Sequence, residues 1–148
     1  MVYDKNNRFN VKSPNISIAI QFTILANSSY ICCLLKQLEK NGIDIYAFVF
    51  LEDKYNKVKF KCVIDNGNNK SLDKLNIMRS ILDNDGIEYS ETKVVKVSSY
   101  TNSNDLSSQF CVLLQNLSVY SFYLGTDESV IFETCCPTKT IQVLSSLF

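Results

Sequence analysis

Histidine is absent from this chain of 148 residues, and glycine and proline are rare, at 4 and 2 residues. Without histidine, nucleophilic catalysis by Cys–His or Ser–His pairs is excluded, because an imidazole takes the proton in both schemes. No apolar run approaches the roughly 20 residues that a membrane helix needs. The polar beginning, "MVYDKNNRFNVKSPN", has no apolar region typical of a secretory signal. We therefore expect a protein of the cytoplasm, or of an organelle stroma or matrix, that is not secreted and does not bind a membrane.

A net charge is also lacking, since 15 Lys and Arg residues balance 15 Asp and Glu residues. The chain has no broad electrostatic attraction for nucleic acid, which we do not expect as a partner. Hydrophobic residues make up 46% of the chain and charged residues 20%, as in globular proteins. The length suits one compact domain, or two very small ones that share a core.

The six cysteines have no C-x-x-C spacing, and four of them form two adjacent pairs, Cys32-Cys33 and Cys135-Cys136. Neighbouring residues on a helix point about 100° apart, so an adjacent pair cannot easily hold one metal ion. Free cysteine packs as a small apolar side chain. We expect buried or half-buried thiols, no metal site and no cofactor.

The apolar pattern of the first two thirds predicts the order strand, helix, strand, strand, helix, strand. Apolar residues alternate from Ile16 to Ile24, as in a strand with one buried face. Ile31, Leu34, Leu35 and Leu38 follow at helical spacing. The same reasoning predicts strands at 43–53, 57–67 and 87–100, a helix at 30–42 with Ser28 or Ser29 as its N-cap, and a helix at 71–86. This order is typical of the α+β ferredoxin-like class, in which two helices cover one face of an antiparallel sheet.

The order then begins again. "SSQFCVLL" at 107–114 matches "SSYICCLL" at 28–35, and "VYSFYL" at 119–124 matches "IYAFVF" at 45–50. "ESVIFETC" supplies a third strand, and Pro137 suits the first turn of a final helix. Internal repetition of this kind predicts two ferredoxin-like units in tandem. We expect an N-terminal segment at 1–14, a first unit at 15–97 and a shortened second unit at 94–148 whose last strand is missing.

The matching segments "LEKNGIDIYAFVF" and "LQNLSVYSFYLGTDESVIFET" resemble those of tandem ACT domain proteins, over about Asn15 to Phe148. The resemblance implies a regulatory module that binds an amino acid or another small ligand, often at an interface between paired domains. It also implies that the chain is not an enzyme. One departure concerns the turn between the first strand and the first helix, which commonly carries a glycine in that family. Here the turn reads "ANSS" in one copy and "TNSNDLSS" in the other, so a close approach of the backbone to a ligand is in doubt.

The polar residues of these two turns are the candidate ligand-binding residues. Their side chains can donate or accept hydrogen bonds, and the first backbone N–H groups of a helix favour an anion. An equally simple interpretation is that they cap two helices and do nothing more. The set consists of Asn27, Ser28 and Ser29 in the first copy, and of Asn104, Asp105 and Ser107 in the second.

Aromatic residues recur on the second strand of each unit: Tyr46, Phe48 and Phe50 in the first, Tyr120 and Phe122 in the second. If Ala47 and Val49 face the helices, these aromatics lie on the open face of the sheet. We expect that face to contact a partner, another sheet or a second copy, since a monomer rarely exposes so much aromatic surface. With Lys57, Lys59 and Lys61 it could instead stack on single-stranded RNA, but the Gly-aromatic pattern of RNA-recognition modules is missing.

Two functions follow from these observations. The first is a non-catalytic regulatory protein that binds a small ligand, an amino acid above all, at a domain or subunit interface. The second is an ACT-like interaction subunit or scaffold of a larger assembly. It no longer binds a small ligand, and it contacts a second copy of itself or another protein. The missing turn glycines favour the second, and the family resemblance favours the first.

Overall fold

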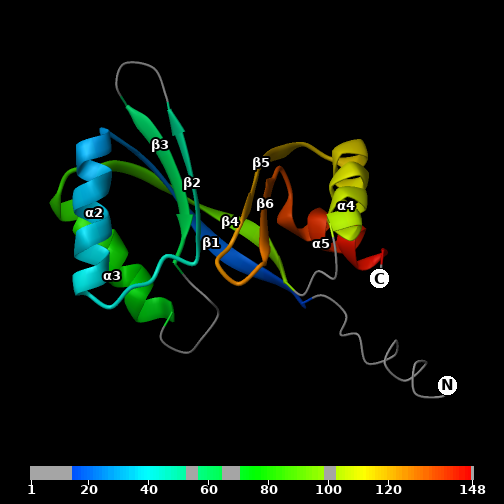
Figure 1. The fold of residues 1–148 in the computed structure, drawn as a ribbon, viewed down its shortest axis with the longest axis horizontal. Helices are drawn as coiled ribbons and strands as arrows, with labels where there is room; N and C mark the ends of the chain where they lie inside the picture. The colour runs from blue at the N-terminus through cyan, green and yellow to red at the C-terminus, as the bar shows by residue number, and fades with distance from the viewer. Residues whose placement is uncertain (1–14, 53–56, 65–70, 99–102, 148) are drawn as a thin grey trace.

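The computed structural model describes residues 15–52, 57–64, 71–98 and 103–147, so the N-terminal segment predicted at 1–14 lies outside the described residues. Strands and helices follow one another in the predicted order (Figure 1). Within the described ranges, no helix is long and apolar enough to cross a membrane. The elements are β1 (Asn15–Ala26), α2 (Ser28–Lys40), β2 (Ala47–Glu52), β3 (Val58–Val63), α3 (Ser71–Asn84), β4 (Glu88–Ser98), α4 (Ser103–Asn116), β5 (Val119–Leu124), β6 (Val130–Thr134) and α5 (Pro137–Ser145).

The six strands of the described ranges belong to one antiparallel sheet, in the order β2-β3-β1-β4-β6-β5. The first four of these positions form the first ferredoxin-like unit, with α2 and α3 as its helices. β4 then also acts as the first strand of the second unit, which continues through α4, β5, β6 and α5. The predicted tandem α+β arrangement is confirmed. The two predicted boundaries, 15–97 and 94–148, overlap within β4, and as divisions of the chain they stay a prediction.

The long first strand supplies the position that the second unit lacks. Residues 15–19 of β1 pair with residues 94–98 of β4, while β6 pairs with the other side of β4 at Val95–Val97. A ferredoxin-like unit needs a strand on that side of its first strand. The N-terminal half of β1 therefore completes the second unit, and no strand follows α5 in the described part of the chain.

Both pairs of helices cover the same face of the sheet. Phe22 and Ile24 of β1 are buried against the first unit's helices, and Ile16, on the same face of the same strand, packs in the second unit's core. Figure 1 shows α2 and α3 at one end of the β1–β4 ribbon and α4 and α5 at the other. Ile18, between the two cores, is half exposed because neither helix pair reaches it.

The first two helices end two residues before the predicted ends at 42 and 86, each just ahead of a glycine. Gly42 and Gly86 follow α2 and α3 with φ of +68° and +65°, the left-handed conformation that glycine adopts without strain. The backbone amide of the next residue, Ile43 or Ile87, then donates to a carbonyl one turn back, at 2.9 Å and 3.0 Å. Ile43 is buried and Ile87 packs against the first core, so each helix end is held by an apolar contact as well.

The prediction of buried or half-buried cysteines is wrong for most of them. On α2 the buried positions are Ile31, Leu34 and Leu38, which lie on one helix face. The two cysteines between them are exposed, and so is Leu35, although its helical spacing predicts a place on the buried face. Pattern alone cannot separate these positions, because every residue from 30 to 35 of this helix is apolar by type. Cysteines 32, 33, 111 and 135 are exposed, Cys136 is half-buried and only Cys62 is buried.

Candidate functional site

The first set of candidate ligand residues lies at the start of α2. Asn27 is the N-cap: its Oδ1 accepts a hydrogen bond from the backbone N–H of Tyr30 at 2.7 Å. The prediction that Ser28 or Ser29 caps this helix is wrong, because both are already helical and only Asn27 keeps the extended backbone that a cap requires. Both serine side chains are exposed. The capping interpretation therefore holds for Asn27, and the ligand-binding role of this set stays a prediction.

The second set lies in the first turns of α4. Asn104 and Asp105 are in this helix, with side chains outside the described part of the structure, and Ser107 is exposed. Asn27 follows one end of β1, and α4 follows the end of β4 that pairs with the opposite end of β1. Eleven residue pairs separate these ends, a span of roughly 34 Å at about 3.4 Å per residue. The two sets are thus two distant places and do not combine into one site.

The edges of the sheet meet where the two units join. Ala47 of β2 forms a bridge with Gly125, just after β5, and the backbone N–H of Thr126 donates to the carbonyl of Tyr46 at 2.9 Å. A Cβ at Gly125 would lie 2.8 Å from the Ser129 Oγ and 3.1 Å from the Tyr46 ring, so only glycine allows this approach. β2 and β5 approach each other at this point in Figure 1 and diverge away from it, and the curled sheet encloses its helix-free face.

A second set of contacts at this junction involves the Tyr46 side chain. Its hydroxyl hydrogen-bonds to the buried Ser129 hydroxyl, which donates to Asp127 Oδ1 at 2.6 Å. The Lys96 ammonium lies 4.1 Å from the centre of the Tyr46 ring, a cation–π contact. Burial raises the pKa of Tyr46, and Asp127 raises it further. The tyrosine therefore stays protonated and acts as a structural link between the units.

A buried ion pair crosses the enclosed face. Lys61 Nζ of β3 lies 2.6 Å from Glu133 Oε1 of β6, with side chains only 10% and 12% exposed. In a flat sheet three strand spacings, about 14 Å, would separate these strands, so the contact exists because the sheet curls. Burial by itself raises the pKa of Glu133, but hydrogen bonds from Lys61, Ser121 and Gln21 lower it below its usual value. The carboxylate is thus ionised at neutral pH.

The same face holds a neutral hydrogen bond beside the ion pair. The Tyr123 hydroxyl of β5 donates to Oε1 of the fully buried Gln21 at 2.6 Å. Around these polar groups lies a small apolar cluster that joins the two units. Its buried members are Ala19, Tyr46, Ala47, Val63, Val94, Tyr123 and Ile131.

This cluster corrects the predicted direction of the aromatic residues. Ala47 and Val49 face the enclosed side and not the helices, so Phe48 and Phe50 lie on the helix side of β2. Phe48 packs against the ring of Phe60, a member of the first core, at 5.7 Å between centroids. The prediction of an open aromatic sheet face is therefore wrong. The error arose because β2 carries apolar residues at every position from 47 to 51, which hides the alternation.

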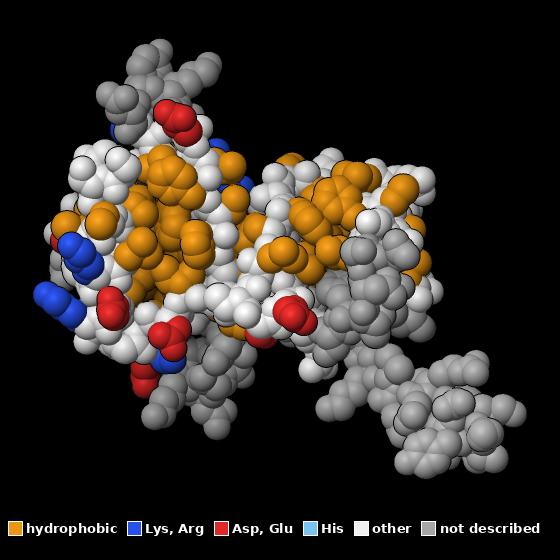
Figure 2. All heavy atoms as spheres, viewed as in Figure 1, with side chains coloured by type: hydrophobic (Ala, Val, Ile, Leu, Met, Phe, Trp, Pro, Cys, Tyr) orange, Lys and Arg blue, Asp and Glu red, His pale blue; other side chains and the backbone are white. Residues whose placement is uncertain are grey.

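The aromatics of β2 and β5 differ in exposure. Phe48 and Phe50 are 54% and 49% exposed and Tyr120 is 63% exposed, whereas Tyr46 is buried. Phe122 is half-buried between the rings of Phe110 and Phe132, at 4.5 Å and 5.3 Å. Figure 2 shows an apolar patch beside α2 in the first unit and another over β5 and α4 in the second. We call them the edge patches and assign to them the exposed large apolar residues of the neighbouring elements: Leu35, Phe48 and Phe50 of α2 and β2, and Leu114, Tyr120 and Leu124 of α4 and β5.

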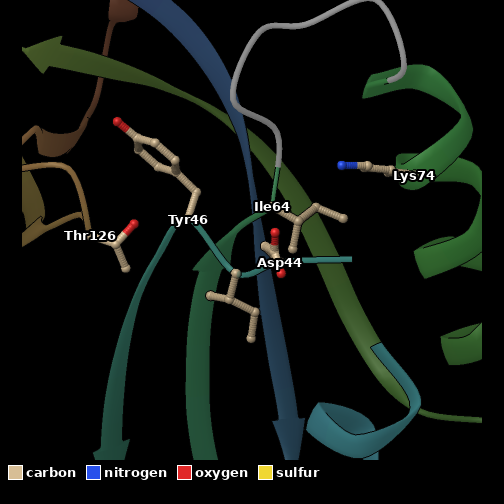
Figure 3. Close-up of a pocket in the computed structure, with 6 residues that line it drawn as sticks. Asp44, Tyr46, Ile64, Lys74 and Thr126 are labelled. Atoms are coloured by element: carbon tan, nitrogen blue, oxygen red, sulfur yellow. The ribbon is translucent and has the colours of Figure 1, made fainter. Parts of the chain in front are cut away.

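A cavity of about 200 Å³ lies at the junction of the units. Figure 3 shows Lys74 reaching from α3 toward Asp44 and Ile64, with Tyr46 and Thr126 on the other side. Sequence reasoning missed this site, because its walls come from four separate segments and no motif joins them. Its lining residues are Asp44, Ile45, Tyr46, Ile64, Lys74 and Thr126.

Metal ligands do not gather anywhere in the described ranges, since no three Cys, Asp or Glu side chains stand close enough to hold one ion. The part of the chain that the structure describes thus offers two kinds of feature for function. One is the charged cavity at the junction, and the other is the pair of exposed edge patches. Both suit binding.

Two ferredoxin-like units joined in one sheet make a tandem ACT-like fold. Solved structures share it. Protein BT0572 from Bacteroides thetaiotaomicron is 17% identical over 89% of this chain and 90% of its own, with a TM-score of 0.70. The ligand-free regulatory subunit of aspartate kinase from Thermus thermophilus is 12% identical over 93% and 97%, with a TM-score of 0.59.

A larger protein contains the fold as one part. Aspartate kinase from Clostridium acetobutylicum, described as an allosteric enzyme, is 16% identical over 94% of this chain but only 35% of its own, with a TM-score of 0.52. No protein-family model matches the sequence, and no curated protein is close enough in sequence to count as a relative. At these identities the likeness is one of fold.

Proposed function

We propose that this protein is a non-catalytic regulatory module that binds a small ligand, an amino acid above all, at a domain or subunit interface. The observation that carries the proposal is the tandem ACT-like fold, which the regulatory subunit of aspartate kinase shares over 93% of this chain and 97% of its own. Such a module works by binding its ligand more tightly in one of two states of the protein.

The subunit interface of the proposal is the pair of edge patches, and the occupant is a second copy of this chain. The patches correspond in part between the two units: Leu35 aligns with Leu114 in the repeat, and Phe50 with Leu124, whereas Phe48 and Tyr120 have no counterpart in the other patch. An exposed apolar surface of this kind suits a symmetric dimer, in which the same surface appears on both sides of the contact. Aromatic residues such as Phe48, Phe50 and Tyr120 are enriched in the buried core of protein interfaces, where a few residues supply most of the binding energy.

A thermal-shift screen of the purified chain against the twenty common amino acids tests ligand binding. A ligand at 100 times its Kd adds about 2.7 kcal/mol to the free energy of unfolding, which for this chain length raises Tm by roughly 5–10 °C. Nucleotides serve as the comparison class. A flat response to all amino acids would contradict the regulatory proposal.

Light scattering tests the dimer. Phe48→Asp with Phe50→Asp places two charges in an edge patch and should give a monomer where the wild type is a dimer. The matched control is Leu72→Asp, which charges an exposed apolar residue of α3 outside both patches. A wild-type monomer, or a double variant that still dimerises, would contradict the proposed interface.

A second candidate function is an interaction subunit without a small ligand. Two observations favour it: the Asn27 side chain is occupied as a helix cap, and neither strand-to-helix turn contains a glycine. A flat screen together with a stable dimer, or capture of one defined protein partner through Phe48 and Phe50, would support this second function.

A further inference from the structure

We propose that the cavity at the junction of the two units is the ligand site, and that it holds a small zwitterion of the α-amino acid class. This inference rests on the proposed regulatory function and names its site. Lys74 binds the carboxylate of the ligand, and Asp44 binds its ammonium group. The site differs from the predicted sets in the strand-to-helix turns, which lie elsewhere on the molecule.

Opposite charges on two walls of one cavity carry the proposal. Asp44 comes from the connection between α2 and β2, and Lys74 from the first turn of α3. Figure 3 shows the Lys74 ammonium directed from its helix toward the Asp44 side of the cavity. Among the described residues, neither group has an opposite charge within 4.0 Å. A ligand with one charge of each sign can therefore satisfy both.

The helix that carries Lys74 adds to the preference for an anion on that wall. Lys74 is the fourth residue of α3, so it lies where the first backbone N–H groups of the helix carry partial positive charge. The carboxylate end of a ligand is thus favoured beside α3, and the ammonium end beside Asp44. This assigns the orientation of the ligand in the cavity.

The remaining walls suit the uncharged part of an amino acid. Ile45 is half-buried and offers a small apolar surface to a side chain, while Ile64 is almost fully buried and contributes little surface to the cavity. Thr126 adds a hydroxyl that can donate or accept. A volume of about 200 Å³ equals that of six or seven water molecules at about 30 Å³ each. The cavity is below the range of about 300–1,000 Å³ typical of drug-sized ligands, which disfavours a nucleotide.

The position of the cavity gives the ligand a way to act. Asp44, Lys74 and Ile64 belong to the first unit, whereas Thr126 belongs to the turn between β5 and β6 of the second. The Thr126 amide already bonds to the Tyr46 carbonyl at 2.9 Å. A bound ligand touches both units at this contact, so it favours the state in which the junction is closed.

Isothermal titration calorimetry of the full chain with each of the twenty amino acids is the test. We expect Asp44→Asn and Lys74→Gln each to raise the Kd of the amino acid that binds the wild type by about tenfold or more, since each removes a charged hydrogen-bond partner. Glu39→Gln and Lys36→Gln change the same charges on exposed positions of α2 and should leave affinity unchanged. Thermal melts of all four variants confirm that the fold is kept.

Modified ligands test the orientation without any substitution in the protein. The N-acetyl form of the binding amino acid lacks the ammonium group, and the amide form lacks the carboxylate. We expect each to bind the wild type at least about tenfold more weakly. Asp44→Asn should show little further loss for the N-acetyl form, and Lys74→Gln little further loss for the amide.

The outcomes separate the two proposals. If an amino acid binds the wild type and both cavity variants bind it equally well, the cavity inference is overturned while the proposed function stands. Ser28→Trp then locates the ligand at the strand-to-helix turn. If no amino acid binds the wild type, both the function and the site are overturned.

Discussion

Replacing Lys61 with methionine removes the ammonium group beside Glu133 and leaves a carboxylate in the enclosed face of the sheet. Removing one partner of a buried ion pair costs about 3–5 kcal/mol. Both side chains keep 10–12% exposure, and Ser121 still donates to Glu133 at 2.7 Å, so we expect about 3 kcal/mol, the low end of that range. For a chain of this length the loss corresponds to a Tm lower by roughly 10 °C.

The double variant Lys61→Met/Glu133→Gln should recover most of this loss. The glutamine is neutral and its amide oxygen can still accept from Ser121, so no buried charge lacks a partner. We expect its free energy of unfolding within about 1 kcal/mol of the wild type, because neutral replacement of a buried pair is often harmless. Urea unfolding of the four proteins in this cycle at pH 7 measures the coupling.

The pair Arg79–Glu91 provides the control. Its closest atoms are 2.7 Å apart, but its side chains are 33% and 27% exposed. Arg79→Met should therefore cost less than about 1 kcal/mol, as is usual for surface ion pairs. If the free energy of unfolding of Lys61→Met also lies within about 0.5 kcal/mol of the wild-type value, the argument that burial makes the Lys61–Glu133 pair important is refuted.

The pH dependence of the free energy of unfolding is a second test of the Lys61–Glu133 ion pair. The pKa of Glu133 is lower in the folded state than its usual value of 4.5, so its carboxylate stabilises the fold above that pH. The stability is lost as the pH falls below 4.5 toward the folded-state pKa. The difference in the free energy of unfolding between the wild type and Lys61→Met should thus shrink in acid. A difference that stays constant from pH 7 to pH 3 would contradict the lowered pKa of Glu133.

Three further predictions concern single positions. Gly125→Ala places a Cβ 2.8 Å from Ser129 Oγ, and we expect a loss of about 1–3 kcal/mol in urea unfolding as the junction is forced apart; no loss would mean that the turn shifts freely. Leu34→Ala should cost about 2–5 kcal/mol by opening a cavity in the first core, whereas Leu35→Ala, one residue further on the exposed face of α2, should change unfolding by less than about 1 kcal/mol. Burial raises the pKa of Cys62 to about 12, so its thiol should resist iodoacetamide in the native protein at pH 8 and react after unfolding. Mass spectrometry detects the label, and rapid labelling of Cys62 in the native protein would contradict its burial.

The element order could be predicted because local patterns determine it. Alternation marks β1, helical spacing marks α2, and glycines 42 and 86 mark the helix ends that the structure shows. The repeat between the two halves then predicts the tandem arrangement. The strand, helix and glycine signals lie within about 15 residues of the elements they describe, which is the range over which backbone geometry sets a period. The repeat compares distant segments, but it predicts only their order and not their contacts.

Contacts between distant segments could not be predicted in this way. Lys61 reads as a solvent-facing residue of an alternating strand, and its partner Glu133 lies 72 residues away. The direction of Phe48 depends on which face of β2 the curled sheet encloses, and that curl depends on the approach of Gly125 to Ala47. The cavity depends on the same approach, since it brings Thr126 to the segment that carries Asp44.

The ladder of eleven residue pairs between β1 and β4 makes each half of the molecule part of the other's structure. A fragment that ends at residue 98 would keep β1 and β4 but expose the face that α4 and α5 cover. A fragment that begins at 94 would lose the strand that borders β4. Folding is therefore expected to be cooperative across the whole described chain, with one unfolding transition and no stable half. Any event at one end, whether a substitution or a bound molecule, then changes the stability of the other end by the same free energy.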